Sequence, residues 1–246
     1  MYWPDVEDLR RFYSTSLGKA CIKAINNKLA LLLGDCKEQA VLGIGYTGPF
    51  VDNLKLKTSE CFSLMPASQG IIHWPDKSAN RAFMAHECEL PIFDNSVEKV
   101  LLIHALENTS LPEAMISEIW RILTPGGKLI MIAPNRGGLW ARLENNPFGS
   151  GRPYSKYQGS KLLSENLFTV TSIKYALHGL PSGIPLLLKI SDFMEKFASR
   201  LLRPLAGVII FEAEKQVYAV RPIKVKEFKS PRFVTIPQIA TSRLHK

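Results

Sequence analysis

A glycine-rich stretch in the first fifty residues has the composition of a nucleotide-binding turn. The apolar run Val41–Ile44 leads into Gly45, and residues 43–48 read Gly-Ile-Gly-Tyr-Thr-Gly, which matches the pattern G-x-G-x-x-G. Glycine lets a backbone approach a ligand closely, because no Cβ stands in the way. The pattern alone leaves three interpretations open: a dinucleotide site, a site for another adenosine cofactor, or a plain turn.

A second group of reactive side chains follows the most apolar run of the chain, residues 99–104, which reads as a buried parallel strand. His104 ends this run, and Glu107 comes three residues later. In open α/β sheets, ligands bind beyond the carboxyl ends of the strands. We therefore predict His104 and Glu107 as candidate catalytic residues, with His104 as a general base. The alternative is that His104 is a packed structural residue.

An irregular loop over residues 135–155 mixes aromatic rings, guanidinium groups and glycines. This mixture suits a pocket for an aromatic or anionic ligand, and it equally suits a surface loop held by its own side chains. Tyr13 is a candidate to cover the same region from the N-terminal side. The candidate substrate-contacting residues are Tyr13, Trp140, Arg142, Arg152 and Tyr154.

The elements that must position these residues alternate between strands and helices. Helices are predicted within an N-terminal cap over residues 1–35, including 16–33, and at 110–123 and 156–165. Ser110 and Glu113 have the spacing of a capping box. Strands are predicted at 41–45, 61–65, 83–85, 99–104, 128–133, 169–177 and 208–220, with an inserted amphipathic helix at about 186–202. This alternation is typical of a parallel sheet with helices on both faces.

Three segments resemble those of a known family. Residues 90–100, LPIFDNSVEKV, resemble the LPF-D-x-S-F-D-x-V segment of class I S-adenosylmethionine-dependent methyltransferases. Residues 118–129, EIWRILTPGGKL, are similar to their E-x-x-R-V-L-x-P-G-G-x-L segment, and residues 12–18, FYSTSLG, to their lead-in. The resemblance spans about residues 10–175 and is to the type 11 group, typified by ubiquinone and menaquinone biosynthesis enzymes. It implies a Rossmann-like α/β fold, with a mostly parallel seven-stranded sheet whose last strand is antiparallel, in one domain over residues 1–222.

The same resemblance implies S-adenosyl-L-methionine as the cofactor. Gly45 matches the first glycine of the family's first motif, whereas Gly43 stands where an acid usually contacts the amino-acid part of the cofactor. The second strand ends in Met65, where the family has an acid for the ribose hydroxyls. Glu87 or Glu89 lies near the place where the family contacts the adenine amino group. The implied cofactor-binding residues are Gly43, Gly45, Tyr46, Gly48, Met65, Pro66, Glu87, Glu89 and His104.

Two functions of different classes are consistent with these features. The leading hypothesis is methyl transfer to an unidentified acceptor, in which alignment of the acceptor with the S–CH₃ bond supplies much of the rate. The alternative is a methyltransferase-fold protein without catalysis, a binding or assembly factor, which would explain the missing acids at Gly43 and Met65. A dinucleotide-dependent oxidoreductase is disfavoured, because it too would need an acid at the end of the second strand.

The formal net charge of +9 is concentrated at the C-terminal end. Residues 221–246 hold seven Lys or Arg and one Glu, so they carry +6 and the remainder carries +3. We predict residues 223–246 to be a flexible basic tail, and we favour a solvated tail over one bound to nucleic acid or an anionic surface. The four cysteines show neither a C-x-x-C pair nor zinc-site spacing, and no apolar run reaches the roughly 20 residues of a membrane span. With no basic, apolar leader, the sequence indicates a cytoplasmic protein without a metal site.

Overall fold

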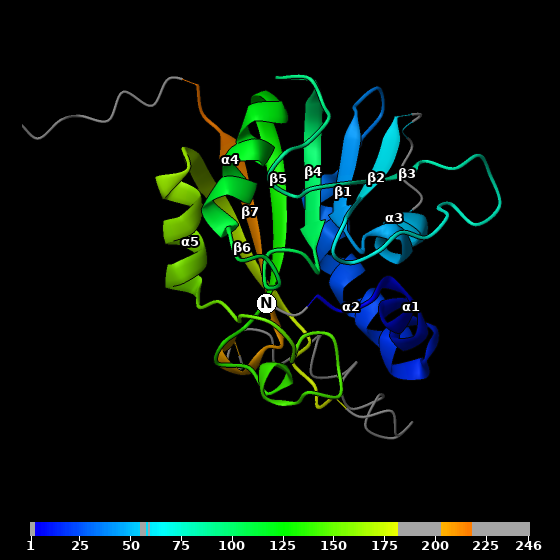
Figure 1. The fold of residues 1–246 in the computed structure, drawn as a ribbon. Helices are drawn as coiled ribbons and strands as arrows, with labels where there is room; N and C mark the ends of the chain where they lie inside the picture. The colour runs from blue at the N-terminus through cyan, green and yellow to red at the C-terminus, as the bar shows by residue number, and fades with distance from the viewer. Residues whose placement is uncertain (1–2, 55–57, 59, 182–202, 218–246) are drawn as a thin grey trace, which may run out of the picture.

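The protein is described by a computed structural model over residues 3–54, 58, 60–181 and 203–217. The described part contains a seven-stranded sheet in the order β3-β2-β1-β4-β5-β7-β6 (Figure 1). Strand β7 runs antiparallel to its neighbours β5 and β6, and the other pairings are parallel. The strands are β1 (Val41–Gly45), β2 (Cys61–Pro66), β3 (Ala82–Ala85), β4 (Val97–Ile103), β5 (Leu123–Pro134), β6 (Phe168–Ala176) and β7 (Val208–Lys215). The predicted fold class, including the antiparallel last strand, is confirmed.

Each face of the sheet has its own hydrophobic core, because successive side chains of a strand point to opposite faces. In β4, Leu101 and Ile103 belong to the core that also holds the apolar side of the N-terminal helices. Val100 and Leu102 belong to the core on the other face. The helices of the first core are α1 (Val6–Ser14), α2 (Ser16–Leu33) and α3 (Gly48–Leu54), and those of the second are α4 (Pro112–Ile122) and α5 (Lys156–Glu165) (Figure 1). The expected helix layers on both faces are therefore present.

Two local predictions differ from the structure. Helix α4 begins at Pro112 with Leu111 at its N-cap position and has no side-chain cap, so the predicted capping box of Ser110 and Glu113 is wrong. The Thr109 hydroxyl instead accepts a hydrogen bond from the Leu111 backbone N–H at 3.1 Å. The side-chain contact before α4 is therefore made by Thr109, one residue before Ser110. Strand β5 begins at Leu123, five residues before the predicted start, and runs through the glycine pair.

Some predicted features lie outside the described residues. These are the amphipathic helix at about 186–202 and the basic tail over 223–246. The domain boundary at residue 222 also falls there and stays a prediction. None of the described helices is both long and apolar enough to cross a membrane.

The two family-like segments are held together by one arginine. Arg121 in α4 donates to the carbonyl oxygens of Leu90 and Ile92, both at 2.9 Å, and pairs through two nitrogens with the Glu118 carboxylate. Glu118 in turn accepts the Leu90 backbone N–H at 3.0 Å, and the hydrogen bonds from Arg121 lower the pKa of its carboxyl group. The E-x-x-R spacing thus fastens residues 90–94 to α4.

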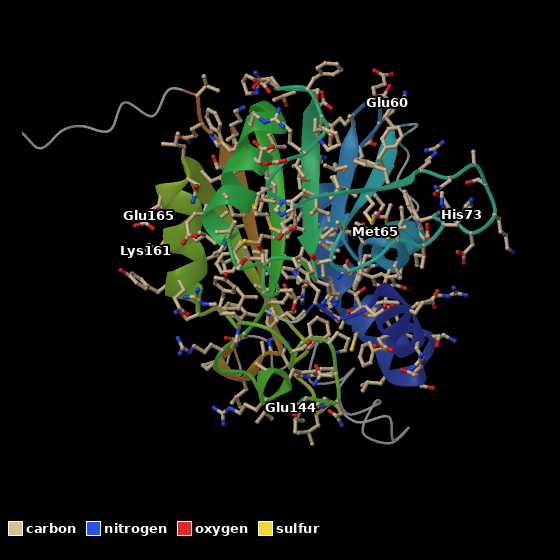
Figure 2. The ribbon with its side chains drawn as sticks, viewed as in Figure 1. Glu60, Met65, His73, Glu144, Lys161 and Glu165 are labelled. Atoms are coloured by element: carbon tan, nitrogen blue, oxygen red, sulfur yellow. The ribbon has the colours of Figure 1, made fainter. Side chains whose placement is uncertain are left out.

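Replacing Arg121 with alanine is expected to lower the free energy of unfolding by about 2–3 kcal/mol, because two carbonyl groups and the carboxylates of Glu118 and Asp94 lose their donor. The effect stays below that of a fully buried pair, since about a third of the Arg121 side chain is exposed (32%) and solvent screens it. Urea unfolding followed by circular dichroism measures the change. The exposed pair of Lys161 and Glu165 on α5 (Figure 2) supplies the control: Lys161→Ala should stay within about 0.5 kcal/mol. Equal effects of the two substitutions would contradict the assignment.

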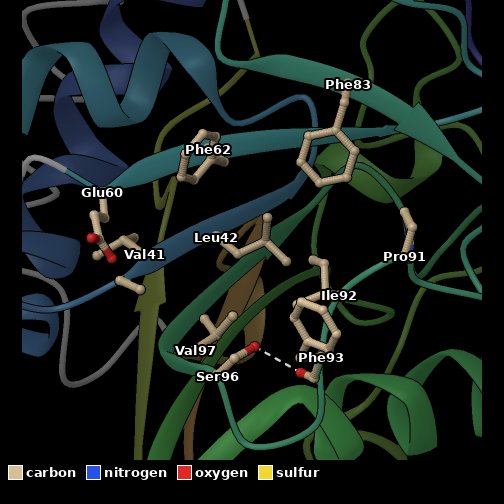
Figure 3. Close-up of a pocket in the computed structure, with 11 residues that line it drawn as sticks. Val41, Leu42, Glu60, Phe62, Phe83, Pro91, Ile92, Phe93, Ser96 and Val97 are labelled. Atoms are coloured by element: carbon tan, nitrogen blue, oxygen red, sulfur yellow. Dashed lines mark hydrogen bonds between the residues drawn. The ribbon is translucent and has the colours of Figure 1, made fainter.

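One apolar hollow lies on the α4 side of the sheet, where the short connection from β3 to β4 crosses without a helix. It has a volume of about 280 Å³, and its lining includes Leu42, Phe62, Phe83 and residues 91–93 and 96–97 (Figure 3). Phe62 is 47% exposed there. Because Val41 and Val97 are the first residues of their strands, this hollow lies at the edge of the sheet opposite the carboxyl ends.

Candidate functional site

The carboxyl edge of the sheet holds a buried hydrogen-bonded chain of three side chains. His104 follows β4, is fully buried, and has a φ of +56°. Its Nε2 lies 2.6 Å from the Tyr13 hydroxyl of α1, and its Nδ1 lies 3.3 Å from Glu107 Oε1. A non-glycine residue with positive φ is uncommon and is often found at functional sites. The structure thus brings together three residues that the sequence singled out.

The Glu107 carboxylate fixes the direction of the hydrogen bonds in this chain, because its Oε1 accepts and the ring N–H of His104 that donates to it is therefore on Nδ1. Burial raises the pKa of Tyr13 well above its usual value, so the hydroxyl keeps its proton and donates a hydrogen bond to Nε2, the other ring nitrogen. His104 is therefore arranged as an acceptor at Nε2 that is oriented by a carboxylate at Nδ1.

Local backbone and amide contacts hold His104 in place. Its carbonyl oxygen accepts a hydrogen bond from Gln69 Nε2 at 2.9 Å and a longer one from Asn108 Nδ2 at 3.3 Å. A carbonyl only accepts, so both amides must turn their NH₂ groups toward it. Helix α1 is fixed to the same loop, because the Val6 backbone N–H donates to the Gln69 carbonyl at 2.9 Å. The loop after β2 therefore positions both Tyr13 and His104.

This arrangement leaves buried acceptor atoms without a donor. Gln69 Oε1 and Glu107 Oε2 have no hydrogen-bond partner among the described residues, although both side chains are 1% exposed. Asn108 Oδ1 is likewise unpaired and lies against Gly151. Buried polar atoms are normally paired, and an unpaired one costs free energy. A ligand with hydrogen-bond donors that binds at the carboxyl edge of the sheet would find its acceptors in these three oxygens.

Aromatic rings surround the Tyr13–His104 pair. Tyr46, from the glycine turn, stacks on Tyr13 with ring centroids 5.7 Å apart, and Phe50 meets Tyr13 edge-on at 5.3 Å. Phe148, from the loop after β5, lies 5.0 Å from the His104 ring. Burial raises the pKa of Tyr46 to about 12, so this phenol is also neutral. Side chains of α1, the glycine turn and the loop after β5 thus meet at one point.

The glycine turn is shaped by the protein itself. Gly45 has a φ of +86°, and a Cβ there would collide with the carbonyl oxygen of Ile103 on β4. The glycine is therefore required by the close approach of β1 to β4, and the sequence interpretation of a gap left for a ligand is not needed to explain it. At Gly43 a Cβ would collide with the Thr47 hydroxyl, which lies 3.2 Å from the Ser63 hydroxyl. The Thr47 side chain fills the space beside Gly43.

The end of β2 is covered by the loop that follows it. Met65 is buried, and its sulfur accepts the Ile72 backbone N–H at 3.4 Å. Figure 2 shows Met65 within the sheet and His73 outside it, on the loop that follows β2. Trp74 packs so closely on Gly48 that a Cβ at Gly48 would lie 2.8 Å from its ring. Met65 and Gly48, two of the implied cofactor residues, are therefore in contact with the chain's own loop.

The remaining predicted residues divide between buried and exposed positions. Glu87 is buried and accepts a hydrogen bond from the Thr109 hydroxyl at 3.0 Å, whereas Glu89 is exposed. Trp140 is buried and donates to the Gly179 carbonyl at 2.8 Å, while Arg142 is exposed. These four side chains have structural or solvent contacts, and their assignment to the cofactor or the substrate stays a prediction.

Arg152 and Tyr154 approach the site from the loop after β5 through the backbone. The Arg152 N–H donates to the Glu107 carbonyl at 2.7 Å, and its guanidinium group lies 5.9 Å from the Tyr154 ring centre. The loop therefore holds the Glu107 backbone in place, while the Arg152 charge faces Tyr154.

Sequence reasoning missed four residues of this edge: Thr47, Gln69, Asn108 and Phe148. Asn108 follows the predicted residue Glu107, and Phe148 lies in the predicted loop, so their positions in the sequence could have identified them. Thr47 lies inside the glycine-rich pattern of residues 43–48, whereas Gln69 had no signal of its own. The described residues contain no group of three or more His, Cys, Asp or Glu side chains that would hold a metal ion.

Comparisons with known proteins agree with the fold. A family model for a methyltransferase domain matches residues 41–131, from the start of β1 into β5. A methyltransferase from Thermotoga maritima, described as a possible histamine N-methyltransferase, is 16% identical with a TM-score of 0.60, over 86% of this chain and 96% of that chain. A methyltransferase solved with the Haloferax volcanii Trm112 methyltransferase activator is 14% identical with a TM-score of 0.60, over 85% and 94%.

A third structure, geranyl diphosphate C-methyltransferase from Streptomyces coelicolor, is 16% identical with a TM-score of 0.53 and covers 78% of each chain. No curated protein sequence matches the chain. At these identities the structural likeness establishes the fold, and the matched family model covers the strands that carry the candidate site. The chain therefore has the fold of the class I S-adenosylmethionine-dependent methyltransferases, and its residues 41–131 match the model of a methyltransferase domain.

Proposed function

We propose that this protein transfers a methyl group from S-adenosylmethionine to an acceptor bound beside His104. The observation that supports this most is the buried chain of Tyr13, His104 and Glu107 at the carboxyl edge of a methyltransferase fold. A general base is useful when the nucleophile starts in its protonated form. In this proposal His104 takes the proton, while Tyr13 and Glu107 fix its tautomer and orientation.

The residues present fit the cofactor with two changes from the family pattern, the missing acids at Gly43 and Met65. Met65 stands where the family has the acid for the ribose hydroxyls. Its sulfur already accepts a hydrogen bond from the Ile72 backbone N–H. Gln69 follows β2 by three residues and keeps a buried, unpaired side-chain oxygen near the same strand end. We propose that this oxygen accepts a hydrogen bond from the cofactor in place of the missing acid. When bound, the cofactor supplies an electrophilic methyl group, and the protein contributes alignment and a base.

The inactive binding or assembly protein stays the alternative, because one set of contacts favours it. Thr47 fills the space beside Gly43, and Trp74 covers Gly48, so the protein's own side chains occupy positions at the glycine turn. The Haloferax volcanii neighbour was solved with an activator protein, and a protein partner of this kind is what the alternative would need. The acceptor, the role of the basic tail and the cytoplasmic location are still predictions.

Calorimetric titration of the full chain, stripped of bound ligand, separates the two functions. S-adenosylmethionine and S-adenosylhomocysteine are expected to bind with micromolar dissociation constants, while NAD and NADP give no heat. A chain that shows no heat with any of the four at millimolar concentration would support the binding-protein alternative.

The Gln69→Met variant is expected to weaken S-adenosylhomocysteine binding by about 3- to 10-fold, the value of one neutral hydrogen bond. Methionine keeps the length of the side chain but has no amide. The matched control is Gln39→Met, because Gln39 also has a buried, unpaired side-chain oxygen but precedes β1 at the opposite edge of the sheet. Equal losses in the two variants would show that Gln69 does not contact the cofactor.

A further inference from the structure

We infer that the apolar hollow beside β1, β2 and β3 is a docking site for the C-terminal segment of the same chain, which binds it through the apolar run at residues 233–239. This site is independent of the proposed function, because it lies at the edge of the sheet opposite the carboxyl ends. Three features of the molecule support the docking: exposed aromatic side chains on a fixed backbone, the place where the described chain ends, and the charges of the two surfaces.

Aromatic side chains at the hollow are exposed although the backbone that carries them is held in place. Phe93 is 87% exposed and Phe62 is 47% exposed, and both line the hollow (Figure 3). The Ser96 hydroxyl donates to the Phe93 carbonyl at 2.7 Å, and the backbone N–H groups of Asn95 and Ser96 donate to carbonyl groups of α4. Exposed apolar side chains that gather in one patch mark an interaction site, whereas single ones do not.

The sheet face at the hollow lacks a covering helix among the described residues. The connection from β3 to β4, residues 86–96, crosses this face without forming one, so Phe62 of β2 and Phe83 of β3 are covered only in part. Elsewhere on the same face, α4 and α5 bury the strands. An apolar sheet face is stable when another element packs on it. A covering segment is therefore expected here, and the described residues do not supply it.

The described chain ends beside this hollow. Lys215, the last residue of β7, donates through Nζ to Asn95 Oδ1 at 2.7 Å. The same Nζ lies 4.1 Å from the ring centre of Trp120 on α4. Asn95 stands between the lining residues Phe93 and Ser96. Strand β7 thus brings the chain to the edge and the face of the sheet on which the hollow lies.

The part of the chain beyond residue 217 is long enough to reach the hollow. Strands β7 and β2 are four positions apart in the sheet, which corresponds to about 19 Å at about 4.8 Å per position. Sixteen residues lead from Val217 to Phe233, and a chain of that length can extend to roughly 50 Å. A segment joined by a linker of this length has an effective concentration on the order of millimolar, so even weak contacts stay occupied.

Sequence and charge identify the part of the segment that fits. Residues 233–239 read FVTIPQI and contain no charged side chain, whereas Lys229 and Arg232 stand shortly before them. Of the described residues that line the hollow, Glu60 is the charged one, and it is acidic. Opposite charges beside an apolar contact fix its register, and the same acid disfavours nucleic acid or an anionic surface as the occupant. For residues 233–239, docking thus replaces the solvated tail that composition alone favours.

Photo-crosslinking in the full chain tests the docking. The photoreactive residue p-benzoylphenylalanine replaces one apolar residue at a time, at Phe233, Val234, Ile236 and Ile239. Irradiation is expected to join at least one of these positions to the lining of the hollow within the same molecule, as mapped by mass spectrometry of peptides. Phe93→Asp should lower the yield of this product by at least about fivefold, because a carboxylate replaces an apolar contact. The matched control is Tyr157→Asp, at another exposed aromatic residue (74%) on α5, which should leave the yield unchanged.

Each other outcome decides against the docking. Crosslinks between two molecules, with a yield that rises with protein concentration, would show that a second copy occupies the hollow. Crosslinks to other parts of the chain, or equal losses in Phe93→Asp and Tyr157→Asp, would show that the hollow is not the site. If no product forms from any of the four positions, the segment does not dock. Circular dichroism checks that Phe93→Asp keeps its fold, as the exposure of Phe93 leads us to expect.

Discussion

Replacing His104 with asparagine is expected to lower kcat for methyl transfer by about 10²- to 10⁴-fold, the usual contribution of a positioned general base. Asparagine is chosen because it tolerates the positive φ at this position better than alanine does. The affinity for S-adenosylhomocysteine should change by less than about threefold, since in our proposal His104 acts on the acceptor. Release of S-adenosylhomocysteine in the presence of an acceptor found by screening small-molecule nucleophiles measures kcat.

Tyr13→Phe accompanies this variant as a test of the hydrogen bond between the Tyr13 hydroxyl and His104 Nε2. It removes the hydroxyl that lies on His104 Nε2 but keeps the ring that stacks on Tyr46. We expect a smaller fall in kcat than for His104→Asn, because Nε2 is then open to take the proton directly. A loss below about threefold in His104→Asn, with the fold intact by circular dichroism, would refute the role of His104 as base.

Gly45→Ala is expected to lower the free energy of unfolding by at least about 3 kcal/mol, because two costs add. The φ of +86° is unfavourable for alanine, and the new Cβ would collide with the Ile103 carbonyl oxygen on the neighbouring strand. Chemical unfolding followed by tryptophan fluorescence measures the change. A substitution at Gly45 therefore disturbs the contact between β1 and β4, whatever its effect on ligand binding.

Gly34→Ala separates the two costs. Gly34 also has a positive φ, +58°, but a Cβ there would have nothing within 4 Å. This variant should lose only the conformational part, about 1–2 kcal/mol. If Gly45→Ala were no more destabilising than Gly34→Ala, β1 and β4 would not be in close contact at this point.

The sequence predicted the sheet well because its strands are buried on both faces and read as short apolar runs. Residues 99–104 illustrate this: the run is apolar because Val100 and Leu102 enter one core, while Leu101 and Ile103 enter the other. His104 and Glu107 were found for the same reason, since the residues after a parallel strand lie at the carboxyl edge.

The missed features depend on partners that are far apart in sequence. Gln69 contacts the His104 backbone 35 residues away and has no local pattern. Thr47 lies in the glycine-rich pattern, but its contact with Ser63 on β2 is 16 residues away in sequence and could not be read from that pattern. The capping box failed for a related reason: Thr109 satisfies the Leu111 N–H before Ser110 is needed. Local spacing states which contacts are available, and the tertiary fold decides which of them form.

The threonine that fills the space beside Gly43 restricts the mutational routes back to the family's usual acid. Gly43→Asp alone would push its Cβ into the Thr47 hydroxyl, so the single change is expected to be selected against even if an acid would improve the site. Thr47→Gly must come first, and that step gives up the hydroxyl contact with Ser63 without any immediate gain. The two positions are therefore epistatic, and the order of substitutions matters as much as their sum. A library that varies 43 and 47 together will reach sequences that stepwise selection does not.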